Sequence, residues 1–313
     1  MSQQRDADGI VGSQSVQSER LNTSNPLSRG LLRAYSITID NSGRRIPWVV
    51  QELVTKHIRK QRDSSRLAEE QVDTVVSFVE EIWDSVEPKM SDIVKSPLFP
   101  LDHGELQEGR DLLWSTLPMR GGGQSKYPYA LPAPKIDRHY GFLTTLKSTW
   151  SWKELSAADD TDVRPYSQPT SENIFPLFLF KVKSESSQGT LYEAEGQLAL
   201  AGYHCVRSRL WMLNHVAPER ERKATDAMVF SCAVSQREAV AHVHYYNPEN
   251  NMHYMSYIDS FYYMRDSQKC VDYVKNVVEW LVKIQQPIIR DELDKLYPMA
   301  LRWKKSNSKA SSR

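Results

Sequence analysis

The most strand-like segment of the chain reads Ile174-Phe175-Pro176-Leu177-Phe178-Leu179-Phe180-Lys181-Val182-Lys183. Its nearly continuous apolar run is typical of a strand in the middle of a sheet, covered by other layers on both faces. Strand alternation directs Lys181 and Lys183, which are two positions apart, to the same face. The segment therefore predicts a central strand that ends in a pair of cations.

Helices and further strands are predicted on both sides of this strand. Before it, the sequence predicts helices over 46–58, between 65 and 88, and over 105–114, a strand over 136–143 and a polar loop over 156–172. After it, the sequence predicts helices over 190–215, 268–285 and 288–296, and strands over 229–234, 239–246 and 252–264. This order predicts an α/β fold with a mixed central sheet flanked by helices.

The two ends of the chain differ in composition from the part between them. Residues 1–28 are rich in Ser, Gln, Asn, Asp and Gly, which predicts a disordered leader. The basic, Ser- and Lys-rich residues 301–313 predict a disordered tail. Between these ends, residues 29–300 predict a single domain, with a helical N-terminal part at 46–115 and a core at 130–296.

Bulk composition excludes few classes of function. The chain has 313 residues, which is enough for a well-buried core. Forty Lys and Arg residues oppose 39 Asp and Glu residues, so net charge does not indicate a nucleic-acid binder, although a local basic groove is compatible with it. Three widely spaced cysteines fit neither a disulfide framework nor a zinc site.

Location is predicted from the cysteines and from hydrophobic runs. Sparse cysteines favour a reducing compartment. No stretch approaches the roughly 20 apolar residues that cross a bilayer, and the N-terminus lacks a hydrophobic signal core. We therefore expect no membrane partner and an intracellular protein, in the nucleus or the cytoplasm.

Two short strings 44 positions apart almost form a metal-dependent nuclease site: Pro134-Lys135-Ile136-Asp137 and Phe180-Lys181-Val182-Lys183. Such a site needs two carboxylates on Mg²⁺, which prefers oxygen ligands, and a nearby lysine. Asp137 and Lys183 fit this pattern. Position 181 holds a lysine where the second acid belongs, and a cation there repels a metal ion.

These strings, with their flanks, carry a resemblance to a known group. Residues 131–142, the strand end Lys181-Val182-Lys183-Ser184 and the helix string Glu193-Ala194-Glu195-Gly196-Gln197 resemble fungal proteins of unknown function. Those proteins carry a PD-(D/E)XK nuclease-like domain, which has a restriction-endonuclease-like core. The resemblance extends from about Tyr35 to Leu296, and the order and spacing of the motifs carry it.

The resemblance implies roles for individual residues. Asp137 would be the first metal ligand, Lys183 the catalytic lysine, and Gln197 a helix residue facing the site. Glu80 or Glu81 would add a further carboxylate. The departures from the family pattern are Ile136 for Pro, Gly196 for Asn and Lys181 for the second acid, and the last of these threatens the chemistry.

Three functions remain open. We favour a catalytically degenerate domain retained for binding DNA, RNA or a protein partner, with Lys135, Arg138 and Lys181 as substrate-binding residues. The first alternative is an active Mg²⁺-dependent phosphodiester hydrolase in which Glu193 or Glu195 replaces the missing acid as a metal ligand. The second is a protein-interaction domain with no role in nucleic-acid binding. Without activity, no cofactor is expected.

The same residues also have plainer interpretations. Asp137 would satisfy local backbone donors, and the two lysines would be solvated at the end of a buried strand. Glu193 and Glu195 would be ordinary acids in the first turn of a helix. The pair His242-x-His244 has a metal-compatible spacing, but half-buried strand histidines explain it more simply.

Overall fold

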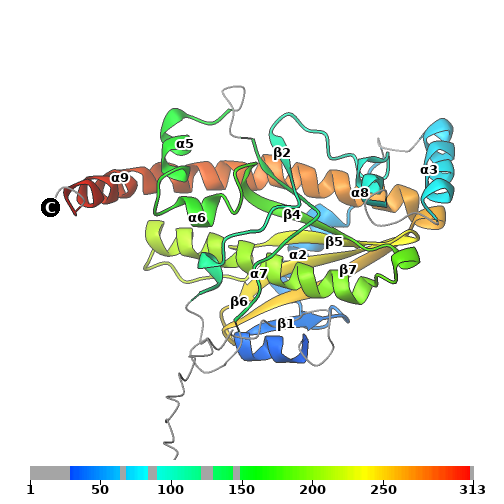
Figure 1. The fold of residues 1–313 in the computed structure, drawn as a ribbon, viewed down its shortest axis with the longest axis horizontal. Helices are drawn as coiled ribbons and strands as arrows, with labels where there is room; N and C mark the ends of the chain where they lie inside the picture. The colour runs from blue at the N-terminus through cyan, green and yellow to red at the C-terminus, as the bar shows by residue number, and fades with distance from the viewer. Residues whose placement is uncertain (1–28, 64–67, 84–89, 121–129, 144–148, 311–313) are drawn as a thin grey trace, which may run out of the picture.

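The computed structural model describes residues 29–63, 68–83, 90–120, 130–143 and 149–310. The expected leader at 1–28 lies outside these residues. The described chain is an α/β fold with a seven-stranded mixed sheet and helices packed against it, as Figure 1 shows. The predicted fold class is confirmed.

The sheet has the strand order β1-β7-β6-β5-β4-β3-β2. Its strands are β1 (Ile37–Asp40), β2 (Leu106–Arg110), β3 (Arg138–Phe142), β4 (Ile174–Val182), β5 (Val229–Val234), β6 (Glu238–Asn247) and β7 (Met252–Tyr262). The β4–β5 and β1–β7 pairs are parallel, and the other neighbours are antiparallel. The carboxyl ends of β1, β4, β5 and β7 therefore point to the same edge of the sheet.

Helices of very different lengths connect the strands. The short ones are η1 (Leu31–Tyr35), α2 (Trp48–Leu53), η2 (Val54–Ile58), η3 (Ser91–Lys95), η4 (Leu117–Met119), α5 (Trp152–Ala158), α6 (Arg164–Ser167) and η6 (Glu185–Ser187). The long ones are α3 (Glu69–Ile82), α7 (Leu191–Val216), α8 (Tyr263–Trp280) and α9 (Gln286–Ala310), with the π-helical η7 (Leu281–Gln285) joining α8 to α9. In the described part of the chain, no helix is long and apolar enough to cross a membrane.

Helices α7 and α8 lie on opposite faces of the sheet. α7 crosses from β4 to the parallel strand β5 and packs against β4, β5 and β6. Strand β5 shows the alternation: Ser231 bonds His244, whose ring lies against Gly202 of α7, while Phe230 on the other face meets Trp280 of α8 edge to face. All nine residues of β4 are buried, as expected for a strand between two layers.

Several predictions for the N-terminal half and the loops were wrong. The expected helix at 105–114 contains strand β2, which pairs with β3, and strand β1, which precedes the expected helical part at 46–115, was not predicted. The expected polar loop at 156–172 contains the end of α5 and all of α6. Both strands are short and lie at the edges of the sheet. β1 has only four residues and β2 is mostly half-buried, so neither carries a strong periodic signal.

The predicted disordered tail is also wrong as far as Ala310, because α9 continues to that residue. Trp303 explains this difference. Its ring lies 6.3 Å from the ring of Trp211 and 5.7 Å from that of His215, both on α7. A tertiary contact between two helices holds the basic segment, and composition alone does not reveal such a contact.

Candidate functional site

The candidate site is an ion pair at the carboxyl end of β4. The amine of Lys181 donates a hydrogen bond to one carboxylate oxygen of Asp137, and the backbone N–H of Val182 donates to the other at 2.7 Å. The two side chains are only 9% and 12% exposed. Both oxygens of the expected first metal ligand are therefore engaged by the protein itself.

Strand register produces this pair. β3 and β4 are antiparallel with Arg138 opposite Phe180, so Asp137, which comes just before β3, lies beside Lys181. Phe178 faces α8, since its ring contacts Tyr273 of that helix, and Phe180 lies on the same face and contacts Phe99, which meets Tyr263 of α8. Lys181 has the opposite parity and faces α7. Lys181 thus occupies the position at which the resemblance implies a second acid.

Residues Lys183 to Glu185, which follow β4, are held by hydrogen bonds to β5 and to the turn after it. The backbone N–H of Lys183 donates to the carbonyl of Val234 at 2.9 Å, which extends the β4–β5 pairing by one residue. Gln236 bonds the hydroxyl of Ser184 and the backbone N–H of Glu185. A Cβ added at Gly189 would lie 3.1 Å from Cδ of Lys183, so the returning loop packs closely on the stem of the lysine.

The first turns of α7 carry the other residues implied by the resemblance. Thr190 caps the helix by accepting a hydrogen bond from the backbone N–H of Glu193 at 3.2 Å. Glu195 bonds Arg29 at 2.8 Å and lies 3.6 Å from His242. Burial raises the pKa of Glu195, but the hydrogen bonds from His242 and Arg29 outweigh burial and bring that pKa below its usual value. Gln197 is half-buried.

Glu195 therefore has a structural role that its sequence context did not reveal. Besides this ion pair, the guanidinium of Arg29 donates to the backbone carbonyl of Tyr192 at 2.9 Å and lies 3.9 Å from the centre of its ring. These contacts join the start of the described chain to the first turns of α7. The carboxylate is held between two cationic or protonatable groups, so it is not free to complete a metal site.

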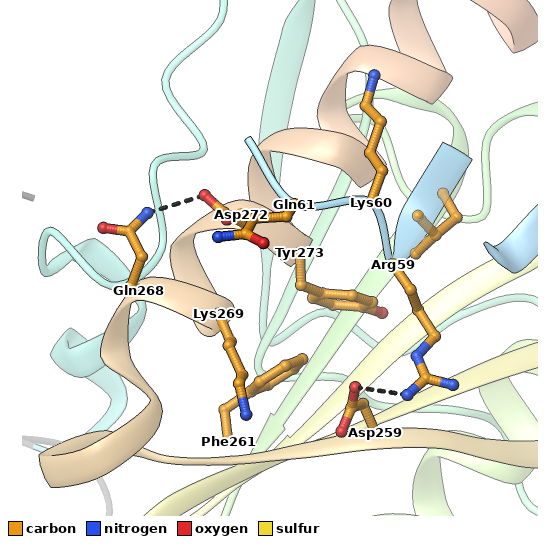
Figure 2. Close-up of a pocket in the computed structure, with 10 residues that line it drawn as sticks. Arg59, Lys60, Gln61, Asp259, Phe261, Gln268, Lys269, Asp272 and Tyr273 are labelled. Atoms are coloured by element: carbon orange, nitrogen blue, oxygen red, sulfur yellow. Dashed lines mark hydrogen bonds and ion pairs between the residues drawn. The ribbon is translucent and has the colours of Figure 1, made fainter. Parts of the chain in front are cut away.

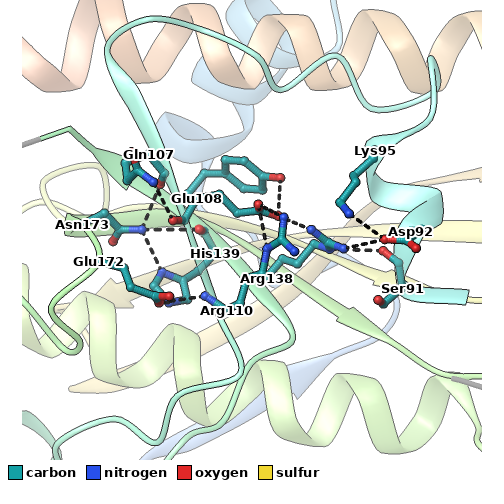
Figure 3. Close-up of polar contacts among 11 residues, drawn as sticks. Ser91, Asp92, Lys95, Gln107, Glu108, Arg110, Arg138, His139, Glu172 and Asn173 are labelled. Carbon is teal, nitrogen blue, oxygen red and sulfur yellow. Dashed lines mark hydrogen bonds and ion pairs between the residues drawn. The ribbon is translucent and has the colours of Figure 1, made fainter. Parts of the chain in front are cut away.

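Arg138 does not lie in a position to bind substrate, which corrects our expectation. Its side chain is 3% exposed, and its guanidinium donates to a carboxylate oxygen of Glu108, to Asp92 and to the backbone carbonyl of Ser91 (Figure 3). Tyr140 bonds the same oxygen of Glu108. The strand direction that brings Asp137 toward α7 turns its neighbour Arg138 to the opposite face.

The remaining candidate residues are exposed. Lys135 lies in the extended segment before β3 and forms an isolated bridge with Leu113. Glu81 lies on the exposed side of α3, whose end is held by the guanidinium of Arg237 at 5.0 Å from the ring of Trp83. Among the described residues, no group of three His, Cys, Asp or Glu side chains is arranged to hold a metal ion. The geometry thus joins Asp137 to Lys181.

A row of buried histidines lies between α7 and the sheet, where the sequence indicated only His242 and His244, as half-buried strand residues. It comprises His139, His204, His242, His244 and His253, each at most 6% exposed. Burial lowers the pKa of His139 to about 4 and those of His204, His244 and His253 to about 3. Two glycines make room for the rings. A Cβ added to Gly109 would lie 2.2 Å from the ring of His139, and a Cβ added to Gly202 would lie 1.9 Å from the ring of His244.

These histidines make stability depend on pH. The four histidines with a lowered pKa, His139, His204, His244 and His253, stay neutral in the folded state but are protonated in the unfolded state below their ordinary pKa of 6.5. Lowering the pH from about 6.5 to 5 should therefore reduce the free energy of unfolding by up to about 1.4 kcal/mol per pH unit for each histidine. Urea unfolding at a series of pH values measures this slope. The His139→Gln variant should have a shallower slope, and equal stability at pH 6.5 and 5 would contradict the prediction.

Comparison with known proteins gives a family but no activity. No curated protein matches the chain. One family model matches residues 36–293, and that family is described as a domain of unknown function, DUF7924. The matched range runs from the residue before β1 into α9, and so includes the whole sheet and the Asp137–Lys181 pair. The chain therefore belongs to the DUF7924 family.

Proposed function

We propose that this protein is a catalytically degenerate PD-(D/E)XK nuclease-like domain that binds nucleic acid through its phosphates without a metal ion. The ion pair between Lys181 and Asp137 is the observation that carries this proposal. A divalent cation at Asp137 would have to displace a buried ammonium group that already neutralises the carboxylate. The loss of the second acid is therefore compensated within the fold.

The arrangement of the core supports the nuclease-like part of the proposal. Asp137 comes just before β3, Lys183 follows the end of the antiparallel strand β4, and α7 crosses to the parallel strand β5. This arrangement brings an acid and a lysine from neighbouring strands to one edge of the sheet, as the resemblance implies. The match of the first acid and the lysine favours descent from a metal-dependent site.

The active alternative has weaker support. It requires Glu193 or Glu195 to supply the missing ligand, and Glu195 is bonded to Arg29 and close to His242. Glu193 lies half-buried in the first turn of α7, a place where an acid stabilises the helix by itself. The degenerate domain therefore accounts for more of the observed contacts.

The cations around the pair support phosphate binding. Lys135 is exposed, Lys183 is half-buried, and Arg237 is 50% exposed in the turn between β5 and β6. Arg237 pairs with Glu185 at 3.2 Å, an exposed interaction that a phosphate can replace at a cost of about 0–1 kcal/mol.

The three cysteines are buried free thiols, which supports our proposal of an intracellular location, in the nucleus or the cytoplasm.

Binding of a fluorescent oligonucleotide tests the proposal. We expect single- or double-stranded DNA or RNA to bind equally well in EDTA and in Mg²⁺, with affinity falling steeply between about 50 and 200 mM salt. Lys183→Gln should reduce the salt slope by about 1. Lys283→Gln, which changes a 70% exposed lysine on η7, should leave it unchanged.

Two results would contradict the proposal. The first is Mg²⁺-dependent cleavage of the oligonucleotide that is abolished in Asp137→Ala, which would establish the active alternative. The second is the absence of any salt-dependent binding to DNA or RNA, which would leave a protein-interaction domain.

A further inference from the structure

Strand β7 has an unpaired edge along its second half. β1 pairs with β7 only over His253–Ser256, whereas β7 continues to Tyr262. Among the described residues, no strand lies beside Tyr257–Tyr262 on the side away from β6. Backbone groups at such an edge are available to an added strand.

Two cavities follow this unpaired edge. One, of about 300 Å³, lies between β7 at Tyr257 and Ile258 and helix α2 with its π-helical continuation η2. The other, of about 410 Å³, lies between β7 at Phe261, the segment Arg59–Gln61 and the first turns of α8, as Figure 2 shows. Arg59 and Asp259 line both cavities. The hollow space therefore has the form of a groove along the strand rather than of one closed pocket.

Asp259 occupies the edge in the middle of this groove. One of its carboxylate oxygens accepts a hydrogen bond from the backbone N–H of Ser260 at 3.0 Å, and the other lies 3.3 Å from the guanidinium of Arg59. The side chains of Arg59 and Asp259 are 51% and 31% exposed. Breaking an exposed pair of this kind costs only about 0–1 kcal/mol.

Exposed charge along the groove is mainly positive. Arg59, Lys60 and Lys269 have side chains that are 51%, 43% and 73% exposed. The acid Asp272 is buried and accepts hydrogen bonds from Gln268 and from the backbone N–H of Arg62. The groove is thus lined by three accessible cations and one accessible carboxylate, Asp259. Lys60 and Lys269 also pair with Glu279 at 3.5 Å and Asp266 at 3.3 Å, which do not line the groove, and these exposed pairs cost only about 0–1 kcal/mol to break.

We propose that this groove binds an extended acidic segment of a partner protein, which adds as a strand to the second half of β7. A backbone carbonyl of the segment replaces Asp259 as the acceptor for Ser260, and its acidic side chains pair with Arg59, Lys60 and Lys269. The groove is formed by β7, α2, η2 and α8, whereas Asp137 and Lys181 lie on the α7 face of β4. The proposal is thus independent of nucleic-acid binding at that pair.

A displayed library of random peptides tests the proposal on the full-length protein. We expect enrichment of peptides with acidic residues at alternate positions, because alternate side chains of a strand share one face. A synthetic peptide of the enriched sequence should bind the wild type and slow hydrogen exchange of the backbone amides of Ser260 and Tyr262. Enrichment without acidic residues, or protection elsewhere in the chain, would overturn the proposal.

Four variants separate strand addition from general charge attraction. Lys269→Gln and Arg59→Gln should each weaken binding of the synthetic peptide about tenfold, whereas Lys283→Gln should not change it. Asp259→Ala should strengthen binding, because it removes the group that competes for Arg59 and Ser260. Equal affinity in all variants, failure to enrich any peptide, or an oligonucleotide competing at the same groove would overturn the proposal. Failure of oligonucleotide binding at Lys183 would leave it intact.

Discussion

The Lys181→Glu variant is expected to bind Mg²⁺ at a site where the wild-type protein does not. The substitution places a carboxylate beside Asp137 in the strand position that the acid-x-Lys pattern requires, with Lys183 two residues later. Two adjacent carboxylates with no cation between them repel each other, and Mg²⁺ relieves that repulsion as an oxygen-preferring ion. A single substitution thus tests whether the site descends from a metal-binding ancestor.

The expected effect on stability is large and depends on Mg²⁺. Without the ion, loss of the buried pair should lower the free energy of unfolding by about 3–5 kcal/mol. Mg²⁺ at about 100 times its Kd should restore about 2.7 kcal/mol. Urea unfolding of the wild type and the variant, with Mg²⁺ or with EDTA, measures both changes.

Lys181→Gln is the matched control, because it removes the ammonium group without adding an acid. This variant should be destabilised but should not respond to Mg²⁺. If Lys181→Glu were also unresponsive, the metal-site ancestry of the Asp137–Lys181 pair would be refuted. If the wild type were stabilised by Mg²⁺ and Asp137→Ala were not, the wild-type site would bind metal and the degenerate function would fall.

Gly202→Ala is expected to destabilise the protein by about 3 kcal/mol. Helix propensity alone predicts the opposite sign, since alanine in a helix interior is favoured over glycine by about 1 kcal/mol. However, a Cβ at this position of α7 would lie 1.9 Å from Nδ1 of His244, which is buried and bonded to Ser231. Overpacking of a core commonly costs about 1–3 kcal/mol and exceeds that when neighbours cannot move, so the clash outweighs the propensity.

A double-mutant cycle assigns this cost to the histidine. In a His244→Ala background, Gly202→Ala should cost much less, giving a coupling energy of about 2 kcal/mol from urea unfolding. Gly104→Ala is the control, because a Cβ there would meet no atom within 4 Å. Equal costs of Gly202→Ala with and without His244 would show that the ring does not impose the glycine.

The fold was predictable where the hydrophobic pattern was strong. The buried run of β4, the long helix α7 and the three strands from Val229 to Tyr262 follow directly from periodicity. The edge strands β1 and β2 were not predicted, because strands of four and five residues carry little periodic signal. The continuation of α9 was also missed, because it depends on the contact of Trp303 with α7.

The candidate site was predictable only in part. Spacing identified Asp137 and Lys181 as the decisive positions, and the register of β3 and β4 brings them together. The burial of Arg138 and the pairing of Glu195 with Arg29 depend on segments far apart in the sequence. No pattern of neighbouring residues in the sequence indicates partners that lie so far apart along the chain. The buried histidines could have been suspected from His242-x-His244 on an apolar strand, but the glycines that receive the rings could not.

In the pair of Lys181 and Asp137, the counterion of the carboxylate is covalently tethered to the chain. A bound metal ion exchanges with the solution, so the occupancy of its site varies with the free concentration of the ion. An ammonium group built into the neighbouring strand has a fixed effective concentration that no chelator or competing ion can lower. The charge of this carboxylate is therefore balanced by a residue of the chain itself and does not depend on the ionic composition of the cell.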